Sequence, residues 1–592
     1  MKPNIYPIDT KVPSDTMASP PLINNNQVAA IFYEVADILE IKSVKFKPVA
    51  YRKAAHGIET LKEDIRTINE QGKLEDIPGV GVNLAAKIRE ILGTGKLAYL
   101  EKLRQEVPEG VLKLADIGGI GPKKALILTR ELGITDREGL EKAAKDGKIR
   151  DLPGFGEKSE KNILLSIGTM KNTGRRFLIG DILPVAERIR KRLEILPETQ
   201  HINLAGSIRR RKETIGDVDI LVASDIPEKI IDEFCLLPEI DRILGRGPTK
   251  SSIVLESGVQ VDLRVVDKDQ YWTTLQYFTG SKAHNIALRR RALERNWKLN
   301  EYGITNLSDG KMLAVQTEQE LYRMLDLQYI EPEMREDSGE IEAAINRTLP
   351  EIVPYNGIKG DLHVHSSWSD GKNTIREMAE AAQAYGYEYI AVCDHAWNPK
   401  ISRGLDESAV AEQHREIELV NRDLDGFMVL AGIECNIDPD GNLDIGNKIL
   451  GDLDVVIASV HSGMDIPQAQ MTNRMVAALH NDQVNILGHP TGRIIQQREP
   501  AQMDLAAVFD AAVEHGISLE INASPARLDL SDTNCRMARE HNARFSMGTD
   551  AKARENLGFM ELGIATARRG WLEAKDIINT LHLRDLLKVL DS

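Results

Sequence analysis

The stretch HINLAGSIRRRKETIGDVDILVAS, residues 201–224, decides how this chain folds at its centre. Its composition predicts a strand, a Gly-Ser turn, a basic loop and a second strand rich in β-branched residues. Because side chains alternate along a strand, Asp217 and Asp219 share one face of the second strand. Val218 and Ile220 point to the opposite face. Two carboxylates are therefore aimed at one point.

A third carboxylate follows in VQVDLRVV, residues 259–266. Alternate apolar residues line one face of this predicted strand, which leaves Gln260, Asp262 and Arg264 on the other face. If the two strands are neighbours, three carboxylates converge and repel one another unless cations bind. Carboxylates suit Mg²⁺ or Mn²⁺, and two such ions can activate a hydroxyl and stabilise a leaving pyrophosphate. The alternative is that Asp217 and Asp219 merely end an exposed edge strand.

Three segments nearer the N-terminus repeat one pattern. They are LEDIPGVGVNLAAKIREIL from Leu74, LADIGGIGPKKALILTREL from Leu114 and IRDLPGFGEKSEKNILLSI from Ile149. Each predicts a short helix, a Gly-x-Gly turn and an amphipathic helix. The turn glycines are Gly79, Gly81, Gly119, Gly121, Gly154 and Gly156. Backbone N–H groups at such turns favour a phosphate, although a helical hairpin without a ligand is the alternative.

The repeats resemble the helix-hairpin-helix motif, which implies sequence-independent DNA binding and Na⁺ or K⁺ at the turns. Further motifs follow in order: Gly206-Ser207, Arg209-Arg210, Gly216-Asp217, Asp262 and YFTGS, residues 277–281. In this combination, residues 26–335 resemble an X-family DNA polymerase, the group that contains DNA polymerase beta. The resemblance implies a template-directed polymerase that fills short gaps in repair of the base-excision type. Its expected partners are gapped or primed DNA and deoxynucleoside triphosphates.

The resemblance also assigns roles to single residues. Asp217, Asp219 and Asp262 would be the catalytic metal ligands, and Arg264 would orient Asp262. The residues expected to bind the incoming nucleotide are Ser207, Arg210, Gly216, Tyr277, Phe278, Gly280, Asn285 and Arg289. Asn285 and Arg289 lie four residues apart in a predicted helix and would share the face toward the nascent base pair and the template. An exposed polar helix face is the alternative.

Residues 26–100 resemble the small N-terminal domain that, in relatives, grips the 5′-phosphate of a gap. Some relatives use a lysine Schiff base there to excise a deoxyribose phosphate, a step that needs a neutral amine. Lys87 lies at the position of that nucleophile, and Lys47 and Tyr51 lie at phosphate-side positions. Asn83 stands where relatives often have another lysine. Lys87 is therefore either a lyase nucleophile or a cation on a helix near DNA.

The sequence changes character after an acidic connector, residues 336–357. Apolar strand-like runs end in possible metal ligands and alternate with helical stretches such as TIREMAEAAQAYG, as in a (β/α) barrel with its site at the strand C-termini. The possible ligands are His363, His365, Asp370, His395, Glu434, His461, His489 and Asp550. Imidazole and carboxylate donors without cysteine favour a multinuclear Zn²⁺, Mn²⁺ or Fe site that hydrolyses phosphate esters.

This series resembles the PHP (polymerase and histidinol phosphatase) domain, a distorted (β/α)₇ barrel that binds up to three metal ions. In bacterial and archaeal X-family polymerases this domain follows the polymerase core and is linked to 3′-5′ exonuclease and related end-processing activities. The family's last ligand is commonly the histidine of an Asp-x-His pair, but here that position is Lys552. A protonated lysine has no lone pair, so one ion is expected to bind weakly or be lost, unless Lys552 is neutral or another residue substitutes.

The net charge of −15 first argues against a nucleic-acid partner, but it is unevenly spread. Residues 1–357 hold 53 Lys and Arg against 54 Asp and Glu, whereas residues 358–592 hold 22 against 36. Basic runs at 209–212 and 289–291 can bind phosphate, although such runs are more often solvated surface. The four dispersed cysteines indicate reduced, buried thiols. Without a membrane-length apolar run or a signal peptide, we expect a cytoplasmic protein, nucleoid-associated when bound to DNA, with no membrane partner.

We therefore expect a monomeric, multidomain protein that combines α+β and α/β domains. Its expected parts are a disordered tail (1–25), a phosphate-binding or lyase-type domain with one helix-hairpin-helix (26–100), a helical DNA-binding subdomain with two more (101–175), a nucleotidyltransferase palm (176–268), a thumb for nucleotide selection (269–335), a linker (336–357) and a PHP phosphoesterase domain (358–592). One rival makes the PHP domain the main enzyme, a 3′ phosphodiesterase or phosphatase or an AP endonuclease. The other rival is a non-catalytic DNA-binding scaffold.

Overall fold

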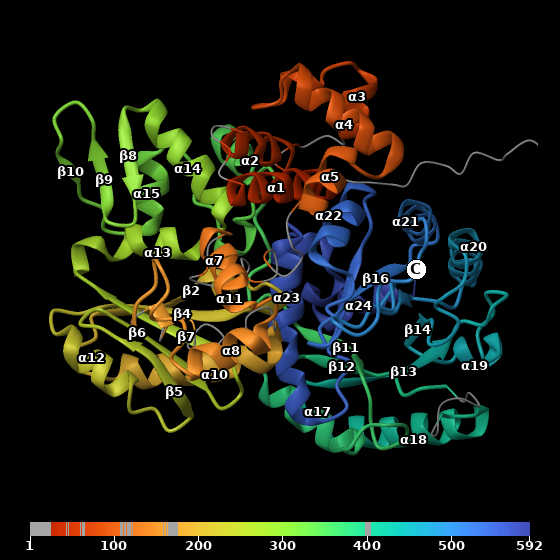
Figure 1. Ribbon diagram of the computed structural model, residues 1–592. Coiled ribbons are helices and arrows are strands. Elements are labelled where there is room, and N and C mark those ends of the chain that lie inside the picture. The colour runs from red at the N-terminus through yellow and green to blue at the C-terminus, as the bar shows by residue number, and fades with distance from the viewer. Residues whose placement is uncertain are drawn as a thin grey trace, which may run out of the picture. The chain divides into compact units, whose positions relative to one another are not determined.

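The computed structural model (Figure 1) describes residues 25–42, 44, 47–59, 61, 65–106, 111, 114, 120, 122–157, 159–160, 163, 176–396 and 404–591. It divides into an N-terminal unit, Met1–Gly174, and a C-terminal unit, Arg175–Ser592. The predicted tail lies outside the described residues except for Asn25, which begins the first helix. Gly119 and Gly121 also lie outside them. None of the described helices is both long and apolar enough to cross a membrane.

The described elements of the N-terminal unit are all helical, as its amphipathic repeats predict. They are α1 (Asn25–Ile41), α2 (Lys47–Glu59), α3 (Ile65–Glu70), η1 (Leu74–Asp76), α4 (Val82–Thr94), α5 (Ala98–Glu106), α7 (Pro122–Leu132) and α8 (Arg137–Lys145). One hydrophobic core runs from Val28 to Ile163. The predicted boundary at residue 100 falls inside α5, so the two predicted N-terminal parts share this core.

Two of the repeats have their Gly-x-Gly turn among the described residues. Gly79 has a φ of +88°, and a Cβ atom there would lie 2.9 Å from the Lys53 side chain. Gly154 has a φ of +80°. Both turns favour glycine because this backbone conformation disfavours a side chain. Gly81 is the N-cap of α4, so the first backbone N–H groups of that helix start at the turn.

The palm is a five-stranded sheet in the order β2-β4-β7-β6-β5, with α10 and α12 packed on one face (Figure 1). Its elements are β1 (Phe177–Leu178), α10 (Ile179–Glu194), β2 (His201–Ala205), α11 (Gly206–Arg209), β3 (Thr214–Ile215), β4 (Asp217–Ala223), α12 (Pro227–Phe234), β5 (Ile240–Arg246), β6 (Lys250–Leu255) and β7 (Gln260–Val266). Strands β4 and β7 are parallel neighbours, with Asp219 directly opposite Asp262. The predicted apolar face of β7, from Val259 to Val265, is buried, so the expected alternation is confirmed.

The thumb surrounds a small antiparallel sheet, β10-β9-β8, with helices. Its elements are η2 (Lys268–Gln270), α13 (Tyr271–Thr279), α14 (Lys282–Glu294), β8 (Trp297–Asn300), β9 (Gly303–Asn306), β10 (Met312–Leu313), α15 (Glu318–Met324) and η3 (Pro332–Met334). The segment expected to be a linker contains helix α16 (Glu340–Asn346) and the fully buried Val353. It therefore packs as part of the C-terminal unit.

A buried ion-pair network joins the thumb to the palm. Arg335 is fully buried and its Nη1 lies 2.8 Å from Glu318 Oε1, while Arg209 Nη2 lies 2.5 Å from Glu318 Oε2. Burial alone would raise the pKa of Glu318, but the two arginines lower it to about 2. The carboxylate is therefore charged, and it holds α15 against the short helix α11 that follows β2.

The last domain is a barrel of seven parallel strands, paired in chain order. The strands are β11 (Gly360–Val364), β12 (Tyr389–Val392), β13 (Met428–Asn436), β14 (Val455–Ser459), β15 (Ile486–Leu487), β16 (Ser518–Asn522) and β17 (Phe545–Gly548). The helices are α17 (Ile375–Ala384), α18 (Glu407–Asp423), α19 (Asn447–Leu450), α20 (Gln468–Leu479), α21 (Leu505–Glu514), α22 (Asp532–Glu540), η4 (Arg554–Phe559), α23 (Met560–Arg569), η5 (Ala574–Asp576), η6 (Ile578–Thr580) and α24 (Leu583–Leu590). A parallel bridge between Val364 and Ala551 nearly closes the barrel, which confirms the predicted distorted (β/α)₇ fold. The four cysteines are free, as expected.

Helix α23 of the barrel domain binds the thumb and the palm through two arginines. Arg568 Nε donates to Glu333 at 2.8 Å, and Arg569 Nη1 donates to the backbone carbonyl of Arg210 at 2.8 Å. A second arginine pair, Arg493 with Glu213 at 2.8 Å, links the barrel to the palm loop. The barrel is therefore fixed to the polymerase-like half by buried and half-buried polar contacts.

We predict that Glu318→Gln lowers the stability of the thumb, because Arg335 would keep a buried charge without a charged partner. The expected loss is about 3 kcal/mol, the usual cost of breaking a buried pair on one side. Urea titration followed by tryptophan fluorescence reports on this region, since Trp272 and Trp297 pack in its core. Arg323→Gln, an exposed change on the same helix, is the control. Equal unfolding midpoints for the two variants would contradict the prediction.

Candidate active sites

The three predicted palm aspartates do come together. Asp219 and Asp262 are cross-strand partners on β4 and β7, and Asp217 begins β4 on the same face as Asp219. The pocket at this point is lined by Asp219, Asp262, Lys250, Arg264, Phe278 and neighbouring backbone. The geometry is that of a carboxylate cluster open to a ligand, as the alternation along both strands predicts.

The electrostatics of this cluster call for a cation. Burial raises the pKa of Asp219 to about 7, and the charges of Asp217 and Asp262 add to that rise. Burial and the Asp262 charge also raise the pKa of Asp217. The raised pKa values of Asp217 and Asp219 reflect burial and repulsion by neighbouring carboxylates, and a divalent ion would relieve that repulsion. The residues therefore fit the Mg²⁺ or Mn²⁺ that the sequence predicts.

Glycine is required in the turn that precedes Ser207. Gly206 has a φ of +61°, and a Cβ atom there would lie 2.4 Å from Asp219 Oδ2. Gly280 has a φ of +68°, and its Cβ would approach Arg210 Nη1 to 3.1 Å. The Gly-Ser and Thr-Gly-Ser motifs thus keep space beside a predicted catalytic carboxylate and beside a predicted triphosphate ligand. Gly216 has no such restriction, because its Cβ would meet nothing closer than 3.5 Å.

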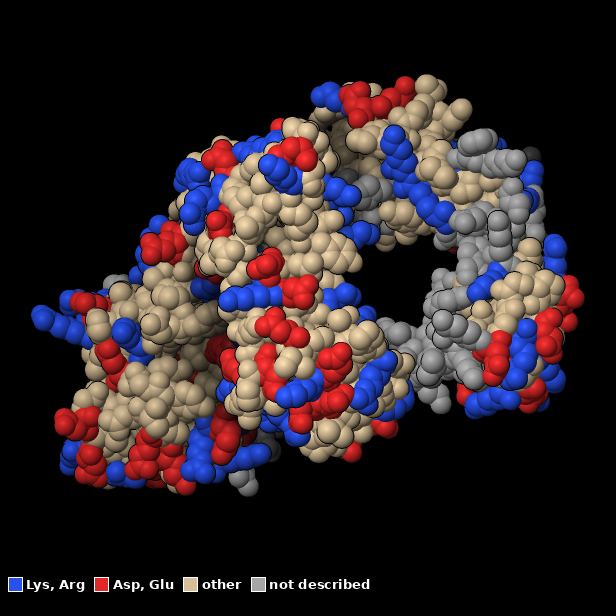
Figure 2. All heavy atoms as spheres, turned by 90° about the vertical axis from the view of Figure 1, so that its left-hand side faces the viewer, with Lys and Arg blue, Asp and Glu red and all other residues tan. Residues whose placement is uncertain are grey.

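The basic run at 209–212 is neither solvated surface nor an open phosphate site. Arg209 binds Glu318, Arg210 Nε lies 3.0 Å from Glu336 Oε1, and Arg211 binds Glu561. Arg210 Nη1 also donates to the carbonyl of Thr279 at 2.5 Å. Arg210 must therefore exchange Glu336 for a triphosphate if it is to bind a nucleotide. On the face drawn in Figure 2, Lys and Arg side chains are likewise interspersed with Asp and Glu.

Two expected side-chain roles are wrong in this structure. Arg264 does not orient Asp262: its guanidinium lies 4.6 Å from the centre of the Phe278 ring, and Gln260 Nε2 lies 3.2 Å from Asp262 Oδ1 instead. Asn285 does not share an open helix face with its neighbour four residues on. It is buried because α14 packs on the end of α13, where its Nδ2 donates to the carbonyl of Tyr277 at 2.7 Å.

Arg289 is different from Asn285, since its Nε donates to the Asn285 backbone carbonyl at 3.2 Å and the residue is exposed. Asn285 therefore positions the Tyr277-Phe278 segment from behind. The sequence did not indicate that Asn285 is buried, because helix 282–294 has polar residues on every side.

In the N-terminal unit, Lys87 Nζ lies 4.2 Å from the centre of the Tyr99 ring. Burial lowers the pKa of Lys87, and the Lys47 charge adds to this against the opposing effect of Glu90. Lys47 is exposed at the start of α2, whereas Tyr51 is largely buried against Phe32. Tyr51 is thus a core residue, and a role as an open phosphate ligand does not fit its burial.

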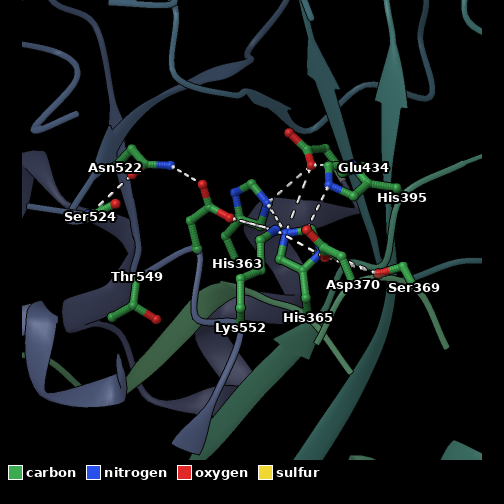
Figure 3. Close-up of polar contacts among 12 residues, drawn as sticks. His363, His365, Ser369, Asp370, His395, Glu434, Asn522, Ser524, Thr549 and Lys552 are labelled. Carbon is green, nitrogen blue, oxygen red and sulfur yellow. Dashed lines mark hydrogen bonds and ion pairs between the residues drawn. The ribbon is translucent and has the colours of Figure 1, made fainter. Parts of the chain in front are cut away.

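All eight predicted barrel ligands gather at the C-terminal ends of the strands. Figure 3 labels five of them: His363, His365, Asp370, His395 and Glu434. Glu434 lies at the centre, with nitrogen atoms of five histidines within 4 Å of its carboxylate: His363, His365, His395, His461 and His489. Asp370 and Asp550 lie beside His365, at 3.4 Å and 3.2 Å. The expected ligand set is therefore brought together at one place.

The distances between the possible ligand atoms fit divalent metal ions. His363 Nδ1 is 2.6 Å from Glu520 Oε1, which leaves its Nε2 facing His365 Nε2 at 3.1 Å. Ligands about 2.1 Å from one ion lie about 3.0 to 3.4 Å apart. Among the described residues, three groups have ligand atoms close enough to share an ion: His363, His365 and Asp550; His365, Asp370 and His395; His395, Glu434 and His461.

Several residues that contact the possible metal ligands, or lie behind them, were not predicted from the sequence. Glu520 binds His363, and the Asn522 Nδ2 donates to Asp550 Oδ2 at 3.2 Å. Asp394 accepts hydrogen bonds from Ser366 and from Gln413. A signal was present for the first two, because Glu520 and Asn522 alternate in the apolar strand SLEIN and so share a face. Polar residues at buried strand ends are the pattern to search for.

Comparisons with known proteins agree with this arrangement. Family models match residues 23–97 (Helix-hairpin-helix domain), 111–169 (SAM-like Helix-hairpin-helix tandem), 274–336 (DNA polymerase beta thumb) and 361–524 (PHP domain). The fold and the two ligand clusters thus define a DNA polymerase of the polymerase beta type joined to a PHP domain.

The particular family follows from a full-length relative. The chain is 37% identical over 567 residues to the DNA polymerase/3′-5′ exonuclease PolX of Bacillus subtilis (strain 168), which covers 95% of this chain and 99% of that protein. It is 29% identical over 231 residues to a probable phosphatase of Thermoanaerobacter sp. (strain X514), covering 37% of this chain and 89% of that one. It is 30% identical over 213 residues to the probable phosphatase YcdX of Escherichia coli O139:H28 (strain E24377A / ETEC), covering 34% and 81%. The chain therefore belongs to the PolX family, the X-family DNA polymerases with a C-terminal PHP domain.

We predict that the Mg²⁺ requirement of primer extension rises at low pH. The pKa of Asp219 is raised to about 7, so below that pH a metal ion must displace a proton. The Mg²⁺ concentration for half-maximal extension should rise about tenfold for each pH unit below 7 and level off above it. The measurement is extension at fixed DNA and nucleotide from pH 6 to 8. His461→Ala, in the barrel, should leave the profile unchanged, and a flat wild-type profile would contradict the assignment.

Proposed function

We propose that this enzyme fills short gaps in damaged DNA by templated addition of deoxynucleotides, and that its PHP domain trims or repairs the 3′ end. The observation that carries the proposal is the convergence of Asp217, Asp219 and Asp262 on neighbouring parallel strands. The named activities of the Bacillus subtilis relative, DNA polymerase and 3′-5′ exonuclease, support it.

In the palm, the three aspartates would hold two Mg²⁺ or Mn²⁺ ions, which when bound activate the primer hydroxyl and stabilise the leaving pyrophosphate. Gly206 leaves room for the Asp219 carboxylate, and Gln260 contacts Asp262. Phe278, backed by Arg264, forms the wall of the pocket beside them. Ser207 and Arg210 would bind the triphosphate, with Arg210 released from Glu336. Tyr277, Gly280 and Arg289 would flank the nucleotide, with Asn285 fixing the segment from behind.

The N-terminal unit would hold the DNA backbone without reading its sequence. Its glycine turns place backbone N–H groups at helix starts, which suits phosphate oxygens and a bound Na⁺ or K⁺. Such contacts position the duplex and carry no base information. Excision of deoxyribose phosphate by Lys87 stays a prediction.

In the PHP domain, the histidines around Glu434 would hold Zn²⁺, Mn²⁺ or Fe ions, which when bound activate water and polarise a phosphodiester. Glu520 fixes the orientation of His363 and also accepts a hydrogen bond from the His489 backbone N–H. Arg527 lies 3.7 Å from Asp550, and its buried Nη1 has no hydrogen-bond partner among the residues that the structure describes. That unpaired donor is suited to a phosphate oxygen of the substrate.

The rival interpretations differ in which site carries the activity. A dead palm that only presents DNA would not need the raised pKa of Asp219 or the space kept by Gly206. A non-catalytic scaffold would need neither ligand cluster, and a relative named as an enzyme matches nearly the whole chain. The interpretation as a polymerase with a PHP domain gives a role to both ligand clusters.

We predict that the two activities separate by single substitutions. Asp219→Asn should lower primer extension on gapped DNA at least about 1,000-fold, because a ligand shared by both ions is lost, and should leave 3′-5′ digestion intact. Glu434→Gln should do the reverse. Labelled gapped DNA resolved on sequencing gels reports both products.

Asp225→Asn, just beyond β4 and outside the cluster, is the matched control and should retain both activities. Extension that survives Asp217→Ala or Asp219→Asn would favour the PHP domain as the main enzyme. A wild-type protein that binds DNA but performs neither reaction would favour the scaffold.

A further inference from the structure

Lys552 is a charged side chain of the PHP centre to which the proposed function gives no role. Its Nζ lies 2.8 Å from Asp550 Oδ1 and 3.3 Å from Asp370 Oδ1. The side chain is about one-third exposed, and Figure 3 shows it directed into the ligand cluster beside His365. A cation of the protein thus bridges two carboxylates that belong to the metal-binding set.

The three ligand groups are not equivalent. The group of His363, His365 and Asp550 and the group of His395, Glu434 and His461 share no residue. Each has its own carboxylate and two imidazoles. The second of these also has His489, whose Nε2 is 2.9 Å from Glu434 Oε1.

The middle group, His365, Asp370 and His395, borrows one histidine from each neighbour. A neutral imidazole has one lone pair, because its other nitrogen carries a proton. His365 faces the first group through Nε2 and Asp370 through Nδ1, at 3.4 Å. His395 faces Glu434 through Nδ1, at 2.8 Å, and Asp370 through Nε2, at 3.7 Å.

If both outer groups hold an ion, His365 uses Nε2 and His395 uses Nδ1 as the ligand atom. The other ring nitrogen of each histidine then carries a proton and faces Asp370 as an N–H donor. Asp370 is the only member that the middle group does not share, and its Oδ1 already faces the Lys552 ammonium. One carboxylate oxygen is too few donors for a divalent ion that must also lie beside an ammonium. The residues of the middle position do not fit a metal ion.

We propose that this PHP centre binds two divalent ions, in the two outer groups, and that the Lys552 ammonium takes the third cation position between Asp370 and Asp550. The inference rests on the proposed metal-dependent role of the domain. The third cation is then the side-chain ammonium of Lys552 instead of a bound metal ion. Lys552 offers N–H groups to an oxygen of the substrate phosphate, and it provides no lone-pair acceptor for water activation.

The experiment counts metal ions in the full-length chain. Asp217→Asn with Asp219→Asn serves as the background, so that the palm does not contribute. The protein is stripped with a chelator, loaded with Mn²⁺, freed of unbound ion by gel filtration, and assayed for manganese per chain by mass spectrometry. The background protein should hold two ions, and adding Lys552→His should raise this to three.

Two further variants separate charge from ligation. Lys552→Met removes the ammonium without supplying a donor, so its count should stay at two. Asp370→Asn should leave the background count at two but lower the Lys552→His count from three to two, because Asp370 is needed only for a middle ion. Circular dichroism establishes that each variant is folded.

Three ions in the background protein would overturn the inference, as would a Lys552→His count that stays at two. Either result leaves the proposed PHP activity standing if the wild-type protein digests 3′ ends. An absence of bound manganese together with an absence of digestion would instead remove the proposed activity of this domain.

Discussion

The close packing of charged and ionisable side chains on adjacent strands is the constraint on which both sites depend. In the palm, parallel pairing of β4 and β7 places Asp219 opposite Asp262, and burial raises the cost of keeping both charged. In the barrel, seven parallel strands direct their C-terminal ends to one point, where Glu434 faces five histidines. The fold makes these clusters by topology alone, and cations make them tolerable.

The same constraint explains how the halves of the C-terminal unit are joined. Every arginine from 209 to 211 is neutralised by an acidic residue from another element, and Glu561 of the barrel is one of these partners. Arg569 of the barrel binds both the Arg210 backbone and Glu336, the partner of the Arg210 side chain. A predicted nucleotide ligand therefore lies in the same polar network as the interface with the PHP domain. The near-neutral net charge of residues 1–357 thus includes arginines that form ion pairs inside the protein.

The features that the sequence predicted correctly depend on local periodicity. The face of β4 and β7 that carries the aspartates follows from alternation, and the ligand at each barrel strand end follows from where the apolar run stops. What it missed depends on packing between distant segments. Asn285 is buried only because α14 lies on the end of α13, and Arg264 reaches Phe278 across the thumb boundary. The shared core of residues 28–163 likewise depends on contacts that no local pattern encodes.

The acidity of residues 358–592 has a partly internal origin. Asp361, Asp394, Glu434, Glu520 and Asp529 are all buried at or near the metal centre, so their charges are not surface charges that solvent screens. Histidines, hydroxyls and Lys552 satisfy them only in part, since imidazoles that bind metal ions stay neutral. Bound metal ions would supply further positive charge. The net charge counted from the sequence therefore overstates the negative charge on the surface that DNA would contact. Electrostatic repulsion between the acidic PHP half and DNA is weaker than the composition implies.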